Sequence, residues 1–431
     1  MPERIDRTVT VRLPSPRTEL RQASRVPRTK RERRWSAQVA GATDRLLERG
    51  DVVRVGPPGG EHFARPDELL VHVDAEAELA AQLQEEGARR ASDDARPRTG
   101  VVRYALPPGS DLHDVVARLR EGRDGTGGVG PNAVLFGVPI MRGCPGRAPE
   151  PARALSLADG DEGRGIRVAV LDTGQAEASM RGAWESAHVS VAPGDVDPLD
   201  QDGDGARDLE AGHGTFVTGV VAQVAPGAEV LAVKALDSDG VTDDLTAAEC
   251  VQRALDEGCQ VLNLSFGGYT HDDRGLVALE AVLPRTEDVA VVAAAGNDST
   301  TRRFWPAASE GVVSVGAVGV RRQRTSFTNS GDWVRACAEG DRLHSTYVEG
   351  TAATDGDGDG APDHFPEAGA YWSGTSFAAP QVAAAVAVRA ARTGEPAGLA
   401  AERLCGDPKA HRVPGLGTLV RTRLRGHPAP P

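Results

Sequence analysis

From residue 165 onward, short apolar runs rich in valine and alanine alternate along the chain with segments of helical pattern. Nearly continuous apolar character over so few residues is typical of strands that are buried on both faces of a parallel sheet. The segment 245–257 has the amphipathic spacing of a helix that covers such a sheet. This alternation predicts an α/β domain with a doubly wound parallel sheet and helices on both faces. The expected strands are residues 165–171, 229–236, 260–266, 289–295 and 312–318.

The region before this domain has its own pattern of strands and helices. Residues 68–73, 101–106 and 133–138 are expected strands, and residues 75–86 and 111–121 are expected helices. Together they predict a small α+β domain, joined to the larger one by a stretch rich in Gly, Pro and Ala. We divide the chain into a basic, disordered N-terminal region at 1–60, the small domain at 61–140, a linker at 141–164, the α/β domain at 165–395 and a C-terminal tail at 396–431.

Composition limits the partners of the chain. Among 431 residues, 40% are apolar and 26% are charged, as in an ordinary globular protein. No apolar run reaches the roughly 20 residues of a membrane helix, and the net charge of −13 argues against nucleic acid as the main partner. The basic stretch 17–34 is either a solvated tail or a segment that binds an acidic partner. We therefore expect neither a membrane nor a nucleic acid as partner.

Targeting and cysteine usage point to a reducing compartment. The first residues contain no apolar core of signal-peptide length, so we expect a cytoplasmic protein, with export by a route other than Sec left open. The cysteines are odd in number and lack metal-ligand spacing, which fits reduced thiols, although a single bridge stays open. They are Cys144, Cys250, Cys259, Cys337 and Cys405.

Polar residues that directly follow the apolar runs are the candidates for chemistry, because ligands of doubly wound sheets bind outside the carboxyl ends of the strands. Asp172 and Asn297 both hold such positions, although each motif taken alone more often marks an ordinary turn. His213 lies between two glycines at the start of an apolar helix, either as a structural histidine or as a ring that another group approaches closely. Ser376 begins an alanine-rich helix, where unpaired N–H groups and the helix dipole can stabilise an oxyanion.

Taken together, these segments resemble the motifs of subtilisin-like serine peptidases, in the order Asp, His, Ser. The resemblance covers about residues 165–391 and rests on D-T-G at 172, H-G-T-F-V at 213, N-L-S-F-G-G at 263 and S-G-T-S-F-A-A-P at 373. It implies a serine endopeptidase with Asp172, His213 and Ser376 as catalytic triad, Asn297 as oxyanion donor and no cofactor for the chemical step. A peptide ligase or transpeptidase of the same fold and a catalytically silent peptide-binding scaffold remain as alternatives.

The same resemblance implies where a peptide or protein substrate binds. The substrate would lie as an added strand between two edge segments, beside a pocket that favours apolar side chains and could admit lysine or arginine at the rim through Asp298. The residues so assigned are Asp239, Gly240, Val241, Leu264, Ser265, Phe266, Gly267, Ala294, Ala295 and Gly296.

Two further features accompany these motifs. The small domain resembles in part the propeptide of the family, with one strand fewer, and would then act as an intramolecular inhibitor, removed by self-cleavage between about 141 and 165; an unrelated accessory domain is the alternative. Two near-identical acidic loops, at 200–208 and 355–363, resemble calcium-binding loops but lack the final bidentate glutamate, so structural Ca²⁺ and solvated loops both stay open. Their candidate ligands are Asp200, Asp202, Asp204, Asp208, Asp355, Asp357, Asp359 and Asp363.

Overall fold

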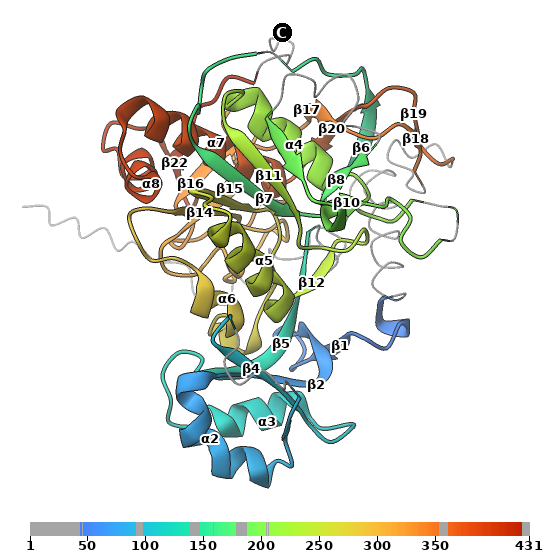
Figure 1. Cartoon of the computed structure of the whole chain (residues 1–431), viewed down its shortest axis with the longest axis vertical. Helices are drawn as coiled ribbons and strands as arrows, with labels where there is room; N and C mark the ends of the chain where they lie inside the picture. Colours follow the sequence, from blue (N-terminus) through green and yellow to red (C-terminus); the bar gives the residue numbers. More distant parts are fainter. Residues whose placement is uncertain are drawn as a thin grey trace, which may run out of the picture.

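The computed structural model describes residues 44, 46–91, 98–137, 147–157, 159–177, 188–203, 205, 207–352 and 361–424. Figure 1 shows two parts, a small one built from the N-terminal segments and a larger one that contains the rest. Within the described ranges, no helix combines the length and the apolar character needed to cross a membrane.

The larger part is built on a nine-stranded sheet. Its strands are parallel except at one edge, where β21 pairs antiparallel with β22. The five apolar runs expected as strands are its adjacent central strands β11, β7, β13, β14 and β15, which confirms the predicted fold class. In spatial order the strands are β21 (Arg412–Val413), β22 (Gly417–Leu419), β16 (Ala336–Glu339), β15 (Val312–Val318), β14 (Ala290–Ala294), β13 (Val261–Leu264), β7 (Arg167–Asp172), β11 (Glu229–Lys234) and β9 (Val189–Val191).

Alternate residues of each strand point to opposite sides of the sheet, so the apolar strands present apolar side chains on both faces. Helices cover both of these faces. Val168 and Val170 of β7 pack in one core with α4 (His213–Val224) and α7 (Thr375–Thr393). Ala169 and Leu171 pack in the other core with α5 (Asp244–Asp256) and α6 (Ala278–Val282). Helix α8 (Ala397–Cys405) packs against α7. The central strands β13, β14 and β15 are thus buried on both faces, which explains their continuous apolar sequence.

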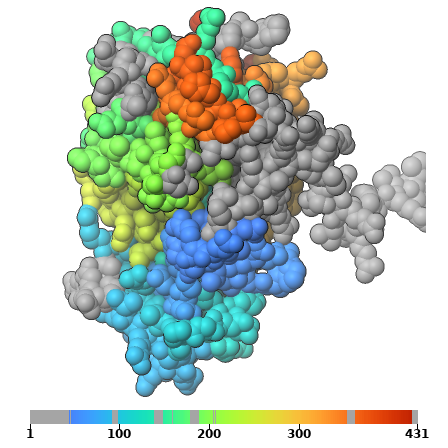
Figure 2. Space-filling model, turned by 90° about the vertical axis from the view of Figure 1, so that its right-hand side faces the viewer, coloured from blue at the N-terminus to red at the C-terminus, as the bar shows by residue number. Residues whose placement is uncertain are grey.

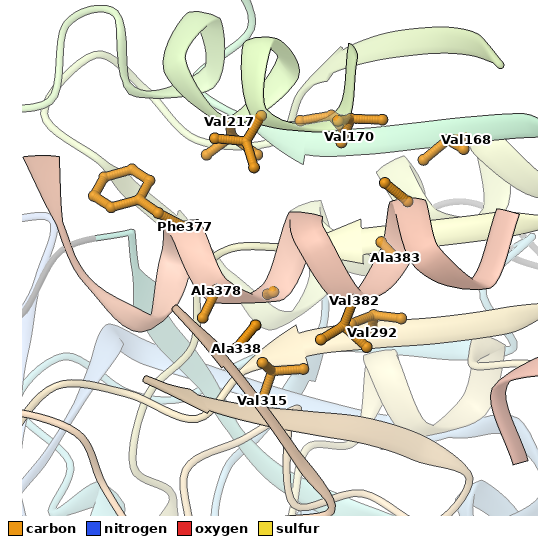
Figure 3. Packing of buried hydrophobic residues seen from close by; sticks show 14 of the residues in the cluster. Val168, Val170, Val217, Val292, Val315, Ala338, Phe377, Ala378, Val382 and Ala383 are labelled. Atoms are coloured by element: carbon orange, nitrogen blue, oxygen red, sulfur yellow. The ribbon is translucent and has the colours of Figure 1, made fainter. Parts of the chain in front are cut away.

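Helix α7 crosses the centre of the larger part. Figure 3 shows Phe377, Ala378, Val382 and Ala383 packed against valines of α4, β7, β14 and β15. Small alanine side chains let the helix approach the sheet closely, and the left-handed Gly394 (φ 72°) ends it. The core therefore fixes the position of the first turn of α7, which carries Ser376.

Short strands and single turns complete the larger part. They form a three-stranded sheet, two two-stranded ribbons and two 3-10 turns. These are β6 (Arg147–Ala152), β17 (Leu343–Thr346) and β20 (Gly369–Ser373); β8 (Gln175–Ala176) with β10 (Val196–Asp197); β18 (Gly350–Thr351) with β19 (His364–Phe365); and η3 (Pro193–Asp195) and η4 (His271–Asp273).

The small part packs two helices on one antiparallel sheet. Its apolar core joins leucines and valines of α2 (Val73–Glu85) and α3 (Leu112–Leu119) to the sheet. The polar loop after α2, in which no strand was expected, contributes the short strand β3, which pairs antiparallel with β4. The strands are β1 (Val53–Val55), β2 (His62–His72), β3 (Arg89–Arg90), β4 (Val101–Ala105) and β5 (Val129–Phe136).

One strand of the larger part, β12 (Val241–Asp243), joins the sheet of the small part by pairing with β5. Ion pairs accompany this junction: Arg65 binds Asp243 at 2.9 Å, and Arg49 lies 3.5 Å from Asp239. Seen from the side, the blue segment that includes β1 lies where the two parts meet (Figure 2). The small part is therefore docked on the larger one through a shared sheet.

Candidate active site

Asp172 and His213 are the most closely connected of the expected site residues. Asp172 ends β7, His213 begins α4, and both side chains are fully buried. The Nδ1 atom of His213 lies 2.7 Å from Oδ1 of Asp172, and the same oxygen accepts the backbone N–H of Thr173 at 2.8 Å. The carboxylate therefore orients the imidazole ring. Its Nε2 atom, which has no hydrogen-bond partner among the described residues, is the nitrogen left for acid–base chemistry.

The glycines on either side of His213 make room for other parts of the protein rather than for a ligand. A Cβ on Gly214 would collide with the carbonyl oxygen of Gly174, in the turn that follows Asp172. A Cβ on Gly212 would lie 2.9 Å from Val348, and its φ of 82° is unfavourable for other residues. The chain segments that carry Asp172 and His213 can approach each other because Gly214 lacks a side chain, whereas Gly212 leaves room for Val348 and Tyr347.

Ser376 is the second residue of α7 and is 2% exposed. Its Oγ atom lies 3.3 Å from the carbonyl oxygen of Gly137 and 3.3 Å from that of Ser265. The His213 ring lies 5.2 Å from the ring of the next residue, Phe377. Across the described part of the chain, the hydroxyl of Ser376 donates to these carbonyls and not to His213. In enzymes, the hydrogen bond between a nucleophile and its base is often long or poorly aligned until the substrate binds.

Pro380 connects the helix to the site. As proline, it lacks the N–H that would bond the carbonyl of Ser376 four residues earlier. That freed carbonyl accepts the hydroxyl of Ser265 at 3.0 Å instead. The proline therefore leaves no carbonyl unpaired and ties the first turn of α7 to the segment after β13.

Asn297 follows β14 and is held by the residue before Ser376. Its amide oxygen accepts the backbone N–H of Thr375 at 2.8 Å and the hydroxyl of Thr375 at 3.0 Å. Because Thr375 engages the oxygen, the NH₂ group is the end of the amide that can donate to a carbonyl oxygen beside Ser376. Thr375 belongs to the S-G-T-S motif, but its role in orienting Asn297 cannot be read from the sequence.

The chain's own residues 134–137 lie between the two segments expected to bind substrate. Val134 and Phe136 pair with β12, and Phe136 also exchanges backbone hydrogen bonds of 2.8 and 2.9 Å with Gly267. The N–H of Gly137 donates to the carbonyl of Gly240 at 2.9 Å. The end of β5 is thus an added strand that reaches Ser376, visible in Figure 1 as the extension of β5 toward β12.

A small cavity beside Ser376 is lined by four of the ten residues expected to bind substrate, Ser265, Phe266, Ala294 and Gly296. Leu264 and Ala295 do not line it and are buried in hydrophobic cores. Phe304 and Asp298 also line the cavity, and no motif in the sequence marks Phe304. The lining residues are Phe136, Gly137, Ser265, Phe266, Ala294, Gly296, Asn297, Asp298, Phe304, Thr375 and Ser376.

The first acidic loop brings carboxylates together. One carboxylate oxygen from each of Asp200, Asp202 and Asp208 lies within 4.8 Å of the others. Burial, together with the charges of neighbouring aspartates, raises the pKa of Asp208 to about 6. Asp204 and residues 355, 357 and 359 of the second loop lie outside the described residues, whereas Asp363 is described and buried. Arg207, in the first loop, donates to the carbonyl of Val348 at 3.4 Å, so the first loop lies beside the chain that leads to the second.

The cysteines of the described residues, Cys250, Cys259, Cys337 and Cys405, are free thiols. Burial raises the pKa of each, to about 12 for Cys337 and to about 11 for the other three. They are therefore protonated and unreactive at neutral pH.

Comparisons with known proteins agree with this geometry. The model of the Subtilase family matches residues 163–399, more than half of the chain. Subtilisin E of Bacillus subtilis (strain 168) is 32% identical over 248 residues, which cover 53% of this chain and 56% of that protein. The subtilisin of Bacillus pumilus is also 32% identical over 248 residues, which cover 78% of its length. The match thus spans little more than half of the first relative.

Among solved structures, fervidolysin from Fervidobacterium pennivorans, described as a keratinolytic enzyme related to subtilisin, is similar in fold. The TM-score is 0.54 at 19% sequence identity, and the alignment covers 83% of this chain and 60% of fervidolysin. A likeness at this identity concerns the fold alone. The family match and the subtilisin relatives show that this chain belongs to the Subtilase family.

Proposed function

We propose that the protein is a serine endopeptidase that hydrolyses peptide bonds through an acyl-enzyme on Ser376. The observation that carries this proposal is the fully buried 2.7 Å contact between His213 and Asp172, placed beside a serine at the start of a helix. A buried carboxylate that accepts from Nδ1 fixes the tautomer in which Nε2 can take a proton. Subtilases need no cofactor for this step.

In the proposed reaction, His213 Nε2 removes the hydroxyl proton as Ser376 Oγ attacks the carbonyl carbon of the substrate. The carbon–nitrogen bond then breaks, and the same proton passes from His213 to the leaving amine. Water then attacks the carbonyl carbon of the ester while His213 takes its proton, and the acid is released as the proton returns to Ser376 Oγ. The NH₂ group of Asn297 and the backbone N–H of Ser376 stabilise the oxyanion in both halves.

The alternatives differ in what happens to the acyl-enzyme. A ligase or transpeptidase would use the same residues but transfer the acyl group to an amine, so products on peptides with free amino termini separate the two. A silent scaffold would bind peptides at β12 and Gly267 without cleaving them. The hydrogen-bonded Asp172–His213 pair and the oriented amide of Asn297 favour catalysis over that alternative.

We also propose that the small part is an intramolecular inhibitor. This is supported by residues 134–137, which fill the cleft as an added strand and bring the Gly137 carbonyl to 3.3 Å from Ser376 Oγ. The bound strand blocks access of other peptides until the chain is cut beyond residue 137.

We further propose that the first acidic loop binds a structural Ca²⁺. Asp200, Asp202 and Asp208 offer the hard oxygen ligands that this ion prefers. Burial, together with the charges of neighbouring aspartates, raises the pKa of Asp208, and a bound cation would favour its charged form.

The test of the main proposal uses the purified full chain and its Ser376→Ala variant. The wild-type chain should react with a fluorophosphonate probe, cleave peptides and become shorter with time. Ser376→Ala should do none of these and should keep its full length. Undiminished peptide hydrolysis in Ser376→Ala would contradict the assignment of the nucleophile.

A further inference from the structure

Asp197, the last residue of β10, is a carboxylate that the proposed reaction does not use. Its residue is 2% exposed, and its two oxygens accept four hydrogen bonds from groups of the protein. Burying a carboxylate is costly unless such donors compensate it, so an elaborate arrangement of this kind calls for an explanation.

One oxygen of Asp197 connects the segments that carry Asp172 and His213. Its Oδ2 atom accepts the hydroxyl of Thr173 at 3.0 Å and the backbone N–H of Gly212 at 2.8 Å. Thr173 directly follows Asp172, and Gly212 directly precedes His213. The Oδ2 atom of Asp197 therefore binds the residue after Asp172 and the residue before His213.

Thr173 extends this connection to the other side of His213. While its hydroxyl donates to Asp197, the same oxygen accepts the backbone N–H of Gly214 at 3.0 Å. Helix α4 has no side-chain cap of its own at Gly212. Asp197 and Thr173 thus satisfy the N–H groups before and after His213 that would otherwise lack partners at the helix start.

The other oxygen faces away from this pair. Its Oδ1 atom accepts the backbone N–H of Leu199 at 3.0 Å and the hydroxyl of Ser238 at 2.9 Å. The ammonium group of Lys234 donates to the carbonyl of Thr173 at 3.2 Å. Burial lowers the pKa of Lys234, and the negative charge of Asp197 opposes this effect. The carboxylate thus has one set of donors next to the site and another set outside it.

We propose that Asp197 is a positioning residue, which sets the distance and alignment between Asp172 and His213 by holding Thr173 and Gly212. This inference rests on the proposed peptidase function. Asp197 makes no hydrogen bond to Ser376 or to residues 134–137 among the described residues, so its effect passes through the Asp172–His213 pair.

The two oxygens allow matched variants. Asp197→Asn keeps the shape but has only one acceptor oxygen, and Thr173→Val keeps the shape of Thr173 but removes its hydroxyl. Each should lower kcat by on the order of 10²-fold with little change in KM, the effect of a small misplacement of catalytic groups. Thr173→Ser keeps the hydroxyl and should stay close to wild type. Because both residues act in one chain of bonds, the double variant should lose no more than the worse single variant.

Ser238→Ala provides the control, because it removes a bond to the same carboxylate on the side away from the pair. It should lower the melting temperature but leave kcat within about twofold of wild type. If Asp197 had only a structural role, kcat of Asp197→Asn would stay near wild type, or kcat of Ser238→Ala would fall as much as that of Thr173→Val. Either result would overturn the proposal.

A second measurement keeps this inference separate from the proposed function. In the full chain carrying Ser376→Ala, the proton between His213 Nδ1 and Asp172 should give a downfield ¹H NMR signal. Asp197→Asn should shift or broaden that signal, and Ser238→Ala should not. An inactive wild-type chain with this spectral response would refute the peptidase and retain the positioning role; an unchanged signal in Asp197→Asn would refute the positioning role.

Discussion

The carbonyl oxygen of Gly137 lies 3.3 Å from the hydroxyl oxygen of Ser376, although 239 positions separate the two residues in the chain. Backbone hydrogen bonds to Gly240 and Gly267 hold this contact in place. A Cβ at position 137 would collide with the carboxylate of Glu210 and lie 3.0 Å from Leu236, so one of these neighbours would have to move. Residues 134–137, the cleft strand, thus fit the site closely at a position that has no side chain.

Gly137→Ala should loosen the cleft strand. Overpacking of a tight contact costs about 1–3 kcal/mol, which would raise the open population by roughly 5- to 150-fold. The initial rate at which a fluorophosphonate labels the intact chain should rise accordingly. Gly60→Ala is the matched control, because a Cβ there finds its nearest neighbour at an ordinary 3.5 Å. Equal labelling rates in the two variants would show that residue 137 does not limit access.

Asn297→Ala should lower kcat by about 10²- to 10³-fold while leaving slow labelling of Ser376, because one oxyanion donor is lost and the nucleophile stays. Thr375→Val keeps the backbone N–H bond to Asn297 but removes the hydroxyl bond, so it should cause a smaller loss. A Thr375→Val enzyme slower than Asn297→Ala would contradict the orienting role of this hydroxyl.

The docking of the small part should weaken in acid. His62 of β2, His113 of α3 and His271 of η4 meet where the two parts touch, with ring centroids 5.7 Å apart for His62–His271 and 4.6 Å apart for His113–His271. Burial, together with the charges of the neighbouring histidines and arginines, lowers the pKa of His62 to about 3. Burial likewise lowers the pKa of His271 to about 4, against the opposing charge of Asp272. Arg120, Arg302 and Arg274 are the cations that face them.

The direction of the pH dependence of docking follows from the lowered pKa values of His62 and His271. The docked state binds fewer protons than the undocked state, in which the pKa returns to about 6.5. Docking is therefore strongest above pH 6.5 and should weaken as the pH falls toward 4, by up to about tenfold per pH unit for each histidine. Hydrogen exchange of β5 in the Ser376→Ala chain, between pH 7.5 and 5, measures this. His62→Phe keeps a ring without a titrating proton and should reduce the pH dependence; an unchanged slope would contradict it.

The sequence predicts those parts of the fold that depend on local pattern. Strand β15 has the expected bounds, because a strand buried on both faces is apolar throughout. Asp172 and Asn297 were placed at the carboxyl edge of the sheet for the same reason. The subtilase motifs then supplied the partners that no local pattern links, such as His213 with Asp172.

Contacts between distant segments could not be predicted in this way. The pairing of β5 with β12 joins residues more than a hundred positions apart, and nothing in either segment specifies the other. Strand β3 consists of two exposed arginines and has no apolar face to mark it. Asp197 looks like any aspartate before a proline in a polar loop. Its role depends on four donors from four separate chain positions.

The first acidic loop allows a test of calcium binding. Asp200 accepts the backbone N–H groups of Gly203 and Gly205, so the loop already wraps around this carboxylate. With the pKa of Asp208 raised to about 6, its negative form costs stability above that pH unless a cation compensates it. Millimolar EDTA at pH 7.5 should therefore lower the melting temperature. Ca²⁺ should restore it and Mg²⁺ should do so poorly, because the smaller ion demands tighter octahedral geometry. A site filled at 100 times its Kd would contribute about 2.7 kcal/mol.

Two variants and a pH series identify the source of that response. Asp208→Asn should lose most of the response to EDTA, whereas Asp332→Asn, an exposed aspartate outside the cluster, should keep it. In EDTA the folded state holds the proton of Asp208 more tightly than the unfolded state does, so stability should rise as the pH falls from about 6 toward 4. With Ca²⁺ present this gain should disappear, since protonation then competes with the ion. A melting temperature indifferent to EDTA in the wild-type chain, with the same pH dependence in both conditions, would leave the loop as a solvated insertion.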